Sequence, residues 1–331
     1  MLGRGYPAAA SDPRTNAGNM ARVTAVESGR SGSQPGSQAE PNSRWRAYVA
    51  LTKPRVIELL LVTTVPVMFL AAGGFPPLST MILTLLGGTM AAAGANVINQ
   101  VYDRDIDAVM VRTQQRPLVT GSISASSALR FGILLSVGSV LLLALTVNVV
   151  SAALAAAAIA FYVFIYTMLL KRRTAQNIVW GGAAGCFPVL IGWSAVTGSL
   201  ALTPFVLFAI VFFWTPPHYW PLALRFKADY QAARVPMLPA VADTSAVASA
   251  IVRYSWAMVA ASLLLTPVGG MGWLYTGSAV VLGVLFLAEA YALRSRVRSG
   301  AADPRAMRLF HGSISYLSLL FLAVAIDPFL S

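Results

Sequence analysis

The chain has 331 residues, of which 57% are hydrophobic and only 11% are charged, a composition that excludes a single soluble core because soluble domains need a charged surface to stay dispersed. Its net charge of +12 would suit a nucleic-acid partner, but no cluster of Lys and Arg is interleaved with aromatic residues, so no nucleic-acid binding is expected. Cys186 is the only cysteine, which excludes an intramolecular disulfide and a thiolate metal site.

Residues 1–45 differ in composition from the rest of the chain. They are rich in Ser, Gly, Pro, Asn and Arg and contain no apolar run, which predicts a disordered N-terminal tail. No apolar stretch occurs before Val56, so a cleavable secretory signal is not expected. A mitochondrial transit peptide is the alternative for an Arg- and Ser-rich tail, but Asp12, Glu27 and Glu40 argue against it.

Residues 46–331 contain nine apolar segments of about 20 residues, the length that crosses a hydrocarbon core as a helix. A helix also satisfies its own backbone polar groups in lipid. The segments are approximately 56–73, 79–101, 129–148, 151–170, 178–197, 203–222, 250–269, 273–293 and 311–329. The predicted fold is therefore all-α, a polytopic integral membrane protein with nine transmembrane helices in a lipid bilayer.

The basic residues predict the orientation of these segments. All 24 Lys and Arg residues lie in the tail or in every second connection, and alternate loops such as 73–79 and 197–203 contain none. By the positive-inside rule the N-terminus is cytoplasmic and the C-terminus lies on the opposite side. We expect the protein to lie in the inner (plasma) membrane of the cell.

The connection after the second segment begins with polar side chains at helical spacing. Asn99, Asp103 and Asp107 are four residues apart, so a continuing helix places them on one face, with Asn96 one turn earlier. Such a charge run is often only a solvated helix end. Oxygen ligands directly after an apolar span also suit Mg²⁺, which takes one or two carboxylates together with substrate phosphate oxygens. We therefore predict a Mg²⁺–diphosphate site.

Two arginines, Arg112 and Arg116, follow at the same spacing. Their planar guanidinium groups can bind phosphate oxygens in a bidentate manner. The alternative is that they only set the topology at the membrane edge.

These residues resemble the first acidic motif of the UbiA superfamily of intramembrane prenyltransferases, which has the form NxxxDxxxD. The resemblance covers roughly residues 45–331. It implies nine helices around a central cavity, and transfer of a prenyl group from a prenyl diphosphate with the help of Mg²⁺.

Two further motifs narrow the resemblance. One runs from Lys171 through Asn177 to Trp193, and the other runs from Trp214 through Tyr230 to Pro239. The three motifs in this order are similar to the branch of the superfamily that attaches farnesyl to haem. This resemblance implies farnesyl diphosphate and haem b as substrates, haem O as product, and a possible association with a haem A synthase or a terminal-oxidase assembly.

The motifs define the candidate site. Asn99, Asp103 and Asp107 are expected to hold the metal. Arg112, Arg116, Lys171 and Arg172 are expected to neutralise the leaving diphosphate. Aromatic rings are expected to face the allylic cation. The candidate substrate-binding residues are Asn96, Tyr102, Tyr162, Tyr166, Asn177, Trp193, His218, Lys227, Asp229 and Tyr230.

One departure from the family pattern concerns a second metal. Many relatives carry a second aspartate cluster after the sixth span, whereas here only Asp229 is in place and Lys227 precedes it, which leaves the number of Mg²⁺ ions open. A fuller cluster is expected of the nearest alternative, a UbiA-type enzyme that acts on an aromatic acid or a quinone precursor. A transporter, the alternative from another class, should carry its charges on broken helices at mid-membrane.

Three ionisable residues have two interpretations each. His218 lies among aromatic residues and could contact haem or coordinate its iron, or it could simply be hydrogen-bonded to a neighbour. Glu58 and Glu289 lie within apolar segments, where an ionisable residue is a functional candidate by default. The alternative is that each is paired or protonated.

Overall fold

The computed structural model describes residues 41–330, apart from the side chains of residues 41–43 and 55–61. Most of the predicted tail, residues 1–40, lies outside this part. Residues 41–45 were predicted to be disordered but belong to the first helix, α1. Leu51 of this helix is fully buried, and the Tyr48 ring packs edge-on against Phe131 at 5.0 Å. These tertiary contacts stabilise a short helix whose own sequence is only weakly apolar.

Every regular element in the described part is helical. The elements in chain order are α1 (Pro41–Thr52), α2 (Pro54–Ala72), α3 (Leu78–Tyr102), α4 (Arg104–Val109), η1 (Val111–Thr113), α5 (Ala125–Thr146), α6 (Val149–Ala160), η2 (Phe161–Leu170), α7 (Asn177–Gly181), η3 (Gly182–Cys186), α8 (Phe187–Thr197), α9 (Leu202–Arg225), α10 (Lys227–Ala232), α11 (Leu238–Val241), α12 (Thr244–Gly269), α13 (Trp273–Arg298), α14 (Ala306–Ile326) and η4 (Asp327–Phe329). Elements η1, η3 and η4 are 3₁₀ turns, whereas η2 is a π-helix.

Eight helical stretches in the described part are long and apolar enough to cross a membrane, and each coincides with a predicted segment. Some combine several elements, such as α6 with η2, or α7 with η3 and α8. The segment predicted at 56–73 coincides with α2, of which the apolar part Val62–Ala72 is described. The all-α membrane fold is thus confirmed, while the count of nine spans stays a prediction.

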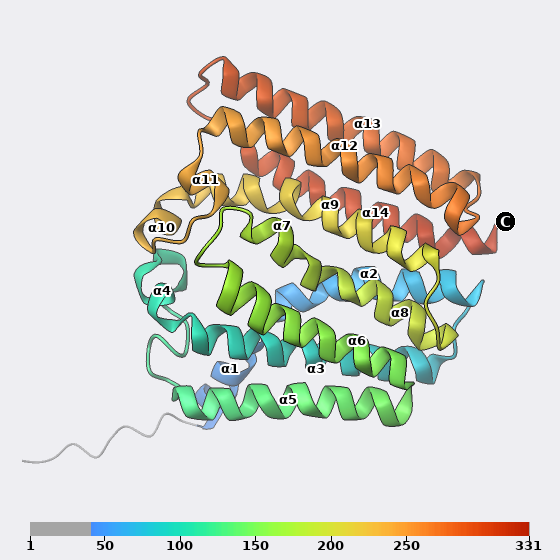
Figure 1. The fold of residues 1–331 in the computed structure, drawn as a ribbon, viewed down its shortest axis with the longest axis horizontal. Coiled ribbons are helices and arrows are strands. Elements are labelled where there is room, and N and C mark those ends of the chain that lie inside the picture. The colour runs from blue at the N-terminus through green and yellow to red at the C-terminus, as the bar shows by residue number, and fades with distance from the viewer. Residues whose placement is uncertain (1–40, 331) are drawn as a thin grey trace, which may run out of the picture. The chain divides into compact units, whose positions relative to one another are not determined.

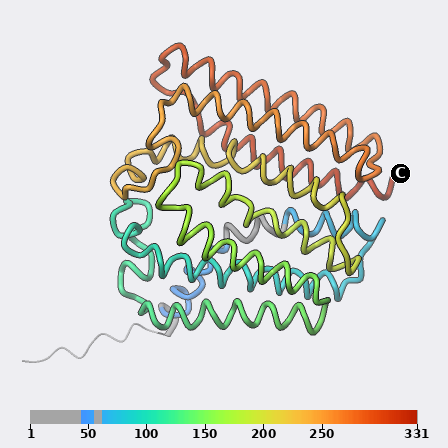
Figure 2. Tube along the Cα trace, viewed as in Figure 1, coloured from blue at the N-terminus to red at the C-terminus, as the bar shows by residue number. Residues whose placement is uncertain are grey.

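The long helices lie side by side along one direction (Figure 1). Helix α3 packs against α5, α2 packs against α8 and α14, and α9 packs against α12 and α14. The short helices α4, α10 and α11 gather at one end, and the C-terminus lies at the other end. The Cα trace in Figure 2 shows the same separation. The segments rich in Lys and Arg therefore meet at the end that the charge pattern predicts to be cytoplasmic.

Small residues allow close packing between α3 and α5. A methyl group added at Gly94 would lie 2.8 Å from the carbonyl oxygen of Gly132, which shows how closely the two backbones approach. The Ser139 hydroxyl donates to the carbonyl of Gly87 at 2.7 Å. Close approach and hydrogen bonds of this kind stabilise helix pairs in lipid, where burial of apolar surface adds little.

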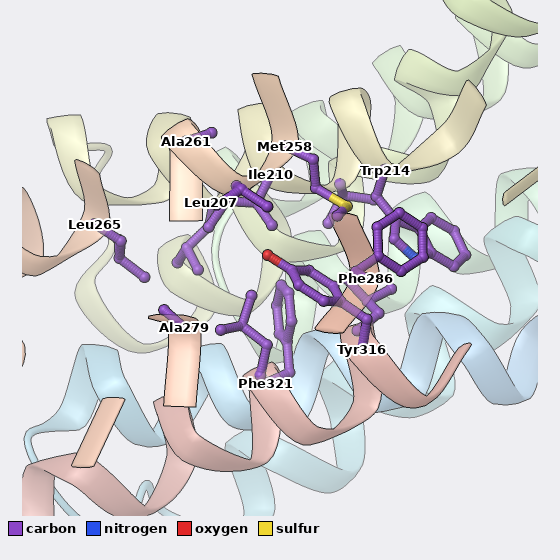
Figure 3. Packing of buried hydrophobic residues seen from close by; sticks show 14 of the residues in the cluster. Leu207, Ile210, Trp214, Met258, Ala261, Leu265, Ala279, Phe286, Tyr316 and Phe321 are labelled. Carbon is purple, nitrogen blue, oxygen red and sulfur yellow. The ribbon is translucent and has the colours of Figure 1, made fainter. Parts of the chain in front are cut away.

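The largest apolar cluster joins α9, α12, α13 and α14 (Figure 3). Leu207, Ile210 and Met258 are fully buried in it. The Tyr316 hydroxyl lies among these side chains and forms a 2.9 Å hydrogen bond with Ser262, so the polar atom does not remain unsatisfied.

Asp327 connects the C-terminal end of the chain to the start of α13. Its carboxylate accepts hydrogen bonds from the backbone N–H groups of Gly272 at 2.5 Å and Tyr275 at 2.9 Å. A carboxylate at a helix N-terminus satisfies free N–H groups and interacts favourably with the helix dipole.

Candidate active site

The predicted acidic face begins inside α3 and continues past the end of that helix. Helix α3 ends at Tyr102, and Asp103 separates it from α4 with φ −91° and ψ 6°. The backbone N–H of Asp103 still donates to Asn99 and that of Asp107 to Asp103, both at 2.9 Å. The four-residue spacing is thereby kept, and Asn99, Asp103 and Asp107 are all buried.

Each acid in this region is paired with a base, which comes from a distant segment for Asp103 and Asp105 and from the same connection for Asp107. Lys171 Nζ forms an ion pair with Asp103 Oδ2, and Arg116 Nη1 lies 2.5 Å from Asp107 Oδ2. Arg172 binds both oxygens of Asp105 at 2.6 Å and lies 3.5 Å from Asp103 Oδ1. These cations offset the repulsion expected between acids at helical spacing.

The Arg172–Asp105 pair also alters the protonation of its members. The hydrogen bond from Arg172 lowers the pKa of the Asp105 carboxyl. The hydrogen bond to Asp105 in turn raises the pKa of the Arg172 guanidinium. Asp105 was not among the predicted site residues, although it lies between two of them.

Lys53 is a cation at this site that sequence reasoning missed. It precedes Pro54 at the start of α2 with φ 54°, a left-handed conformation that is uncommon for a residue with a side chain. Its Nζ donates to Asn99 Oδ1 at 3.2 Å. Burial, together with the nearby charges of Arg116 and Lys171, lowers the pKa of the Lys53 ammonium to about 7. The charge pattern had accounted for Lys53 as a topological signal only.

A cavity of about 230 Å³ lies among the helices, as the family resemblance implies. Its polar end contains Asn96, one helical turn before Asn99, together with Tyr162 and Tyr166 from η2. The Tyr162 hydroxyl donates to Asn96 Oδ1 at 3.4 Å, and the two tyrosine rings lie 5.3 Å apart. From there the cavity extends between α2, α3, α8 and α9 along mainly apolar side chains. Such a space adjoining a charged site suits an isoprenoid chain.

Arg112 joins the two longest basic connections. Its guanidinium donates to the Tyr230 hydroxyl at 2.9 Å and lies 5.3 Å from the centre of that ring. Its backbone N–H lies 3.5 Å from Asp229 Oδ2. The segment after α3 and the short helix α10, which also contains Lys227, are therefore in direct contact.

Seven of the ten predicted substrate-binding residues lie outside the residues that line the cavity, namely Tyr102, Asn177, Trp193, His218, Lys227, Asp229 and Tyr230. Tyr102 is 39% exposed, with the Arg172 guanidinium 5.0 Å from its ring centre. Trp193 lies in the C-terminal half of α8 and packs against the apolar cluster. His218 does not line the cavity, although the adjacent Tyr219 does.

His218 packs toward α14 rather than toward the cavity. Its ring stacks against Trp214 at 4.1 Å and Phe310 at 4.7 Å, and its Nδ1 lies 2.8 Å from Ser313 Oγ. Trp214 and Tyr219 line the cavity instead. This arrangement matches the interpretation of a hydrogen-bonded packing residue, and a contact between His218 and haem stays a prediction.

Two other candidates have structural partners. Asn177 is fully buried and its Nδ2 donates to the carbonyl of Lys171 at 3.2 Å, which holds the turn that carries Lys171. Glu289 is paired with Arg296 at 2.9 Å and Arg308 at 3.1 Å, which matches the paired interpretation. The side chain of Glu58 lies outside the described residues.

Comparison with known proteins decides the family. The sequence profile of the UbiA prenyltransferase family matches residues 60–314. The chain belongs to the UbiA prenyltransferase family. It is therefore an intramembrane prenyltransferase, and the transporter alternative is set aside.

Two curated relatives of this UbiA-family enzyme are named protoheme IX farnesyltransferase. The protein from Streptomyces coelicolor is 56% identical over 314 residues, which is 93% of this chain and 100% of the relative. The protein from Frankia alni is 59% identical over 285 residues, which is 86% of this chain and 98% of the relative.

Solved structures share the fold of the enzyme at low sequence identity. A structure described in work on digeranylgeranylglyceryl phosphate synthase has a TM-score of 0.71 at 16% identity and covers 87% of this chain and 100% of its own. A UbiA homologue from Archaeoglobus fulgidus, bound to GPP and Mg²⁺, has a TM-score of 0.60 at 17% identity and covers 84% and 99%.

Some residues of this UbiA-family site have the chemistry of magnesium ligands. Asp103 Oδ1 is a buried oxygen that accepts no hydrogen bond from the described residues, and the neighbouring donors are hard oxygens. No group of three or more His, Cys, Asp or Glu side chains gathers within residues 41–330 in a way that could hold a metal. An ion at Asp103 and Asp107 would therefore complete its coordination with phosphate oxygens, as Mg²⁺ commonly does.

Proposed function

We propose that this enzyme transfers the farnesyl group of farnesyl diphosphate to a vinyl group of protohaem IX (haem b), giving haem O. The observation that carries the proposal is the high identity, over nearly the whole chain, to relatives named protoheme IX farnesyltransferase. In the reaction the C1–O bond of farnesyl diphosphate breaks and its electron pair leaves with diphosphate. The vinyl group then forms the new bond to C1. Water adds to the resulting porphyrin-side cation and loses a proton.

The residues around Asp103 would stabilise the leaving diphosphate. Mg²⁺ held by Asn99, Asp103 and Asp107 supplies Lewis-acid charge on the diphosphate when bound. Lys53, Lys171, Arg116 and Arg172 all contact these residues or their neighbours. Diphosphate oxygens can replace the carboxylates as partners of these cations, so positive charge is already positioned where negative charge develops.

The cavity would hold the apolar part of the substrate. Its polar end at Asn96 adjoins Asn99, so a diphosphate at the acidic face and an isoprenoid chain in the cavity lie next to each other. The Tyr162 and Tyr166 rings line that same end, where aromatic faces stabilise an allylic cation. The apolar lining also keeps water away from this cation until the vinyl group has reacted.

The location and partners follow from the same proposal. The clustering of the short, charged cytoplasmic helices at one end supports a multi-pass protein of the inner (plasma) membrane, with a cytoplasmic N-terminus and the C-terminus on the opposite side. A haem O product supports association with a haem A synthase or a terminal-oxidase assembly that uses it.

The test is an assay of purified enzyme with haem b, farnesyl diphosphate and Mg²⁺, followed by mass spectrometry of the extracted haem. We expect haem to gain the mass of farnesyl plus water, and we expect Asp103→Ala to abolish this product. Asp303→Ala is the matched control, because this aspartate bonds only to the loop at Arg305 within its described contacts. Unmodified haem together with prenylation of an aromatic acid or quinone precursor would overturn the proposed acceptor.

A further inference from the structure

Thr167 lies at the centre of the site but carries no charge and was not among the predicted residues. It belongs to the π-helix η2 and is fully buried. Its hydroxyl contacts two groups. The carbonyl oxygen of Tyr162 lies at 2.8 Å and the side-chain nitrogen of Asn99 at 3.1 Å.

The number of protons available fixes the direction of these hydrogen bonds. A hydroxyl has one proton to donate, and a carbonyl oxygen can only accept, so the Thr167 proton goes to Tyr162. Toward Asn99 the hydroxyl can then only accept. Asp103 Oδ2 also accepts from Asn99 Nδ2, at 2.7 Å. Both amide protons of Asn99 are used in this way, which leaves its Oδ1 to face a cation, as it does toward the Lys53 ammonium at 3.2 Å.

The π-helix explains why Thr167 is in reach of the acidic helix. The N–H of Lys171 bonds to the carbonyl of Tyr166, five residues earlier, at 2.8 Å. With i→i+5 bonds a helix has about 4.4 residues per turn, so residues nine apart, such as Tyr162 and Lys171, share a face. In an α-helix nine residues make about two and a half turns and would point in opposite directions. The π geometry thus turns Tyr162, Thr167 and Lys171 toward the same side.

We propose that Thr167 is a positioning residue that orients the Asn99 amide so that its oxygen faces the bound cation. This inference rests on the proposed metal site. The hydroxyl acts through Asn99 and does not itself touch the ion. Without the Thr167 hydroxyl, the Asn99 nitrogen loses one of its two hydrogen-bond acceptors. The amide is then held less firmly in its orientation and can rotate. Groups that orient a metal ligand in this way typically change metal affinity by about 10–100-fold.

The test measures Mg²⁺-dependent binding of inorganic diphosphate to purified enzyme in detergent by titration calorimetry. We expect Thr167→Val and Thr167→Ala to weaken binding about 10-fold or more. Thr167→Ser keeps the hydroxyl and is expected to stay within about 2-fold of the wild type, well below that effect. Thr203→Val is the matched control, since Thr203 is a buried threonine at the start of α9 that bonds to the carbonyl of Val268 and not to Asn99.

A second measurement separates positioning from folding. In the transferase assay, the Mg²⁺ concentration for half-maximal activity should rise about 10-fold in Thr167→Val and return toward the wild-type value in Thr167→Ser. Equal binding by the wild type and both hydroxyl-free variants would overturn the inference and leave the proposed function intact. An equal loss in Thr167→Ser would also overturn it, because the hydroxyl would then not matter. No Mg²⁺-dependent binding in the wild type would overturn the proposed metal site as well.

Discussion

The contact between Gly181 and Tyr166 makes a sharp steric prediction. Gly181 lies in α7 beside the cavity, and a methyl group at this position would lie 2.7 Å from Cε2 and 2.9 Å from Cγ of the Tyr166 ring. An ordinary carbon–carbon contact is about 3.5–4.0 Å. Cδ2 of the ring would be nearer still, so in Gly181→Ala the ring must move by more than about 1 Å, and the cavity provides the space into which it can move.

The expected cost follows from two opposing effects. Overpacking of this kind costs about 1–3 kcal/mol. Replacing a helical glycine by alanine returns about 0.5–1 kcal/mol through the unfolded chain. From the mid-points of these two ranges the net penalty is about 1 kcal/mol, which corresponds to a factor of about 5. Because the Tyr166 ring moves into the cavity, we expect most of this penalty as a higher KM for farnesyl diphosphate.

The assay is transferase kinetics with farnesyl diphosphate as the varied substrate. Gly185→Ala is the control, since Gly185 lines the same cavity and a methyl group there meets no atom within 4 Å. Replacing the Tyr166 ring by leucine removes the clash. The double variant Gly181→Ala/Tyr166→Leu should therefore have the same KM for farnesyl diphosphate as Tyr166→Leu alone. A wild-type KM in Gly181→Ala, or an equal rise in Gly185→Ala, would refute the steric reasoning.

Two further predictions concern stability at either end of the molecule. Asp327→Ala removes the acceptor of the Gly272 and Tyr275 N–H groups and should cost about 1–3 kcal/mol, seen as a lower thermal midpoint with an unchanged KM for farnesyl diphosphate. Asp243 caps the start of α12 by accepting a hydrogen bond from the Ser245 N–H at 2.8 Å. An equally lowered midpoint in Asp243→Ala would contradict a special role of Asp327, because loss of any cap would then suffice. Lys53 has a pKa of about 7 in the folded protein against 10.5 for the free side chain. Between these two pH values the folded state therefore binds fewer protons than the unfolded state, so the contribution of Lys53 to the free energy of unfolding rises with pH. The unfolding free energy of the wild type should increase relative to Lys53→Met from about pH 7 upward, and a constant difference between pH 6 and pH 9 would contradict the buried position of the ammonium.

Hydropathy and charge predicted the membrane helices well because lipid imposes a simple condition on each segment. The span predicted at 203–222, for example, is the core of α9, Leu202–Arg225. Helix α1 could not be predicted in the same way. Its residues are only weakly apolar, and Leu51 becomes buried through contact with a distant part of the chain.

The site was predictable where its pattern is local. Asn99, Asp103 and Asp107 repeat every four residues, so their common face can be recognised without a structure. Lys53 and Thr167 reach Asn99 from 46 and 68 residues away, and neither has a spacing that indicates this contact.

His218 shows the converse problem, because its aromatic neighbours in sequence suggested a shared surface. Consecutive residues on a helix point in different directions. Tyr219 consequently lines the cavity, while His218 bonds to Ser313 on another helix.

The π-helix at Phe161–Leu170 has a consequence for how such a chain can change during evolution. Its register, rather than any one side chain, decides which residues face the acidic helix. Loss of a single residue from this stretch would restore the ordinary helical repeat and turn Lys171 away from Asp103, although every functional side chain would still be present. We therefore expect selection against insertions and deletions in this segment, although a surface loop would tolerate them. The length of the segment should be conserved as strictly as the identity of its residues.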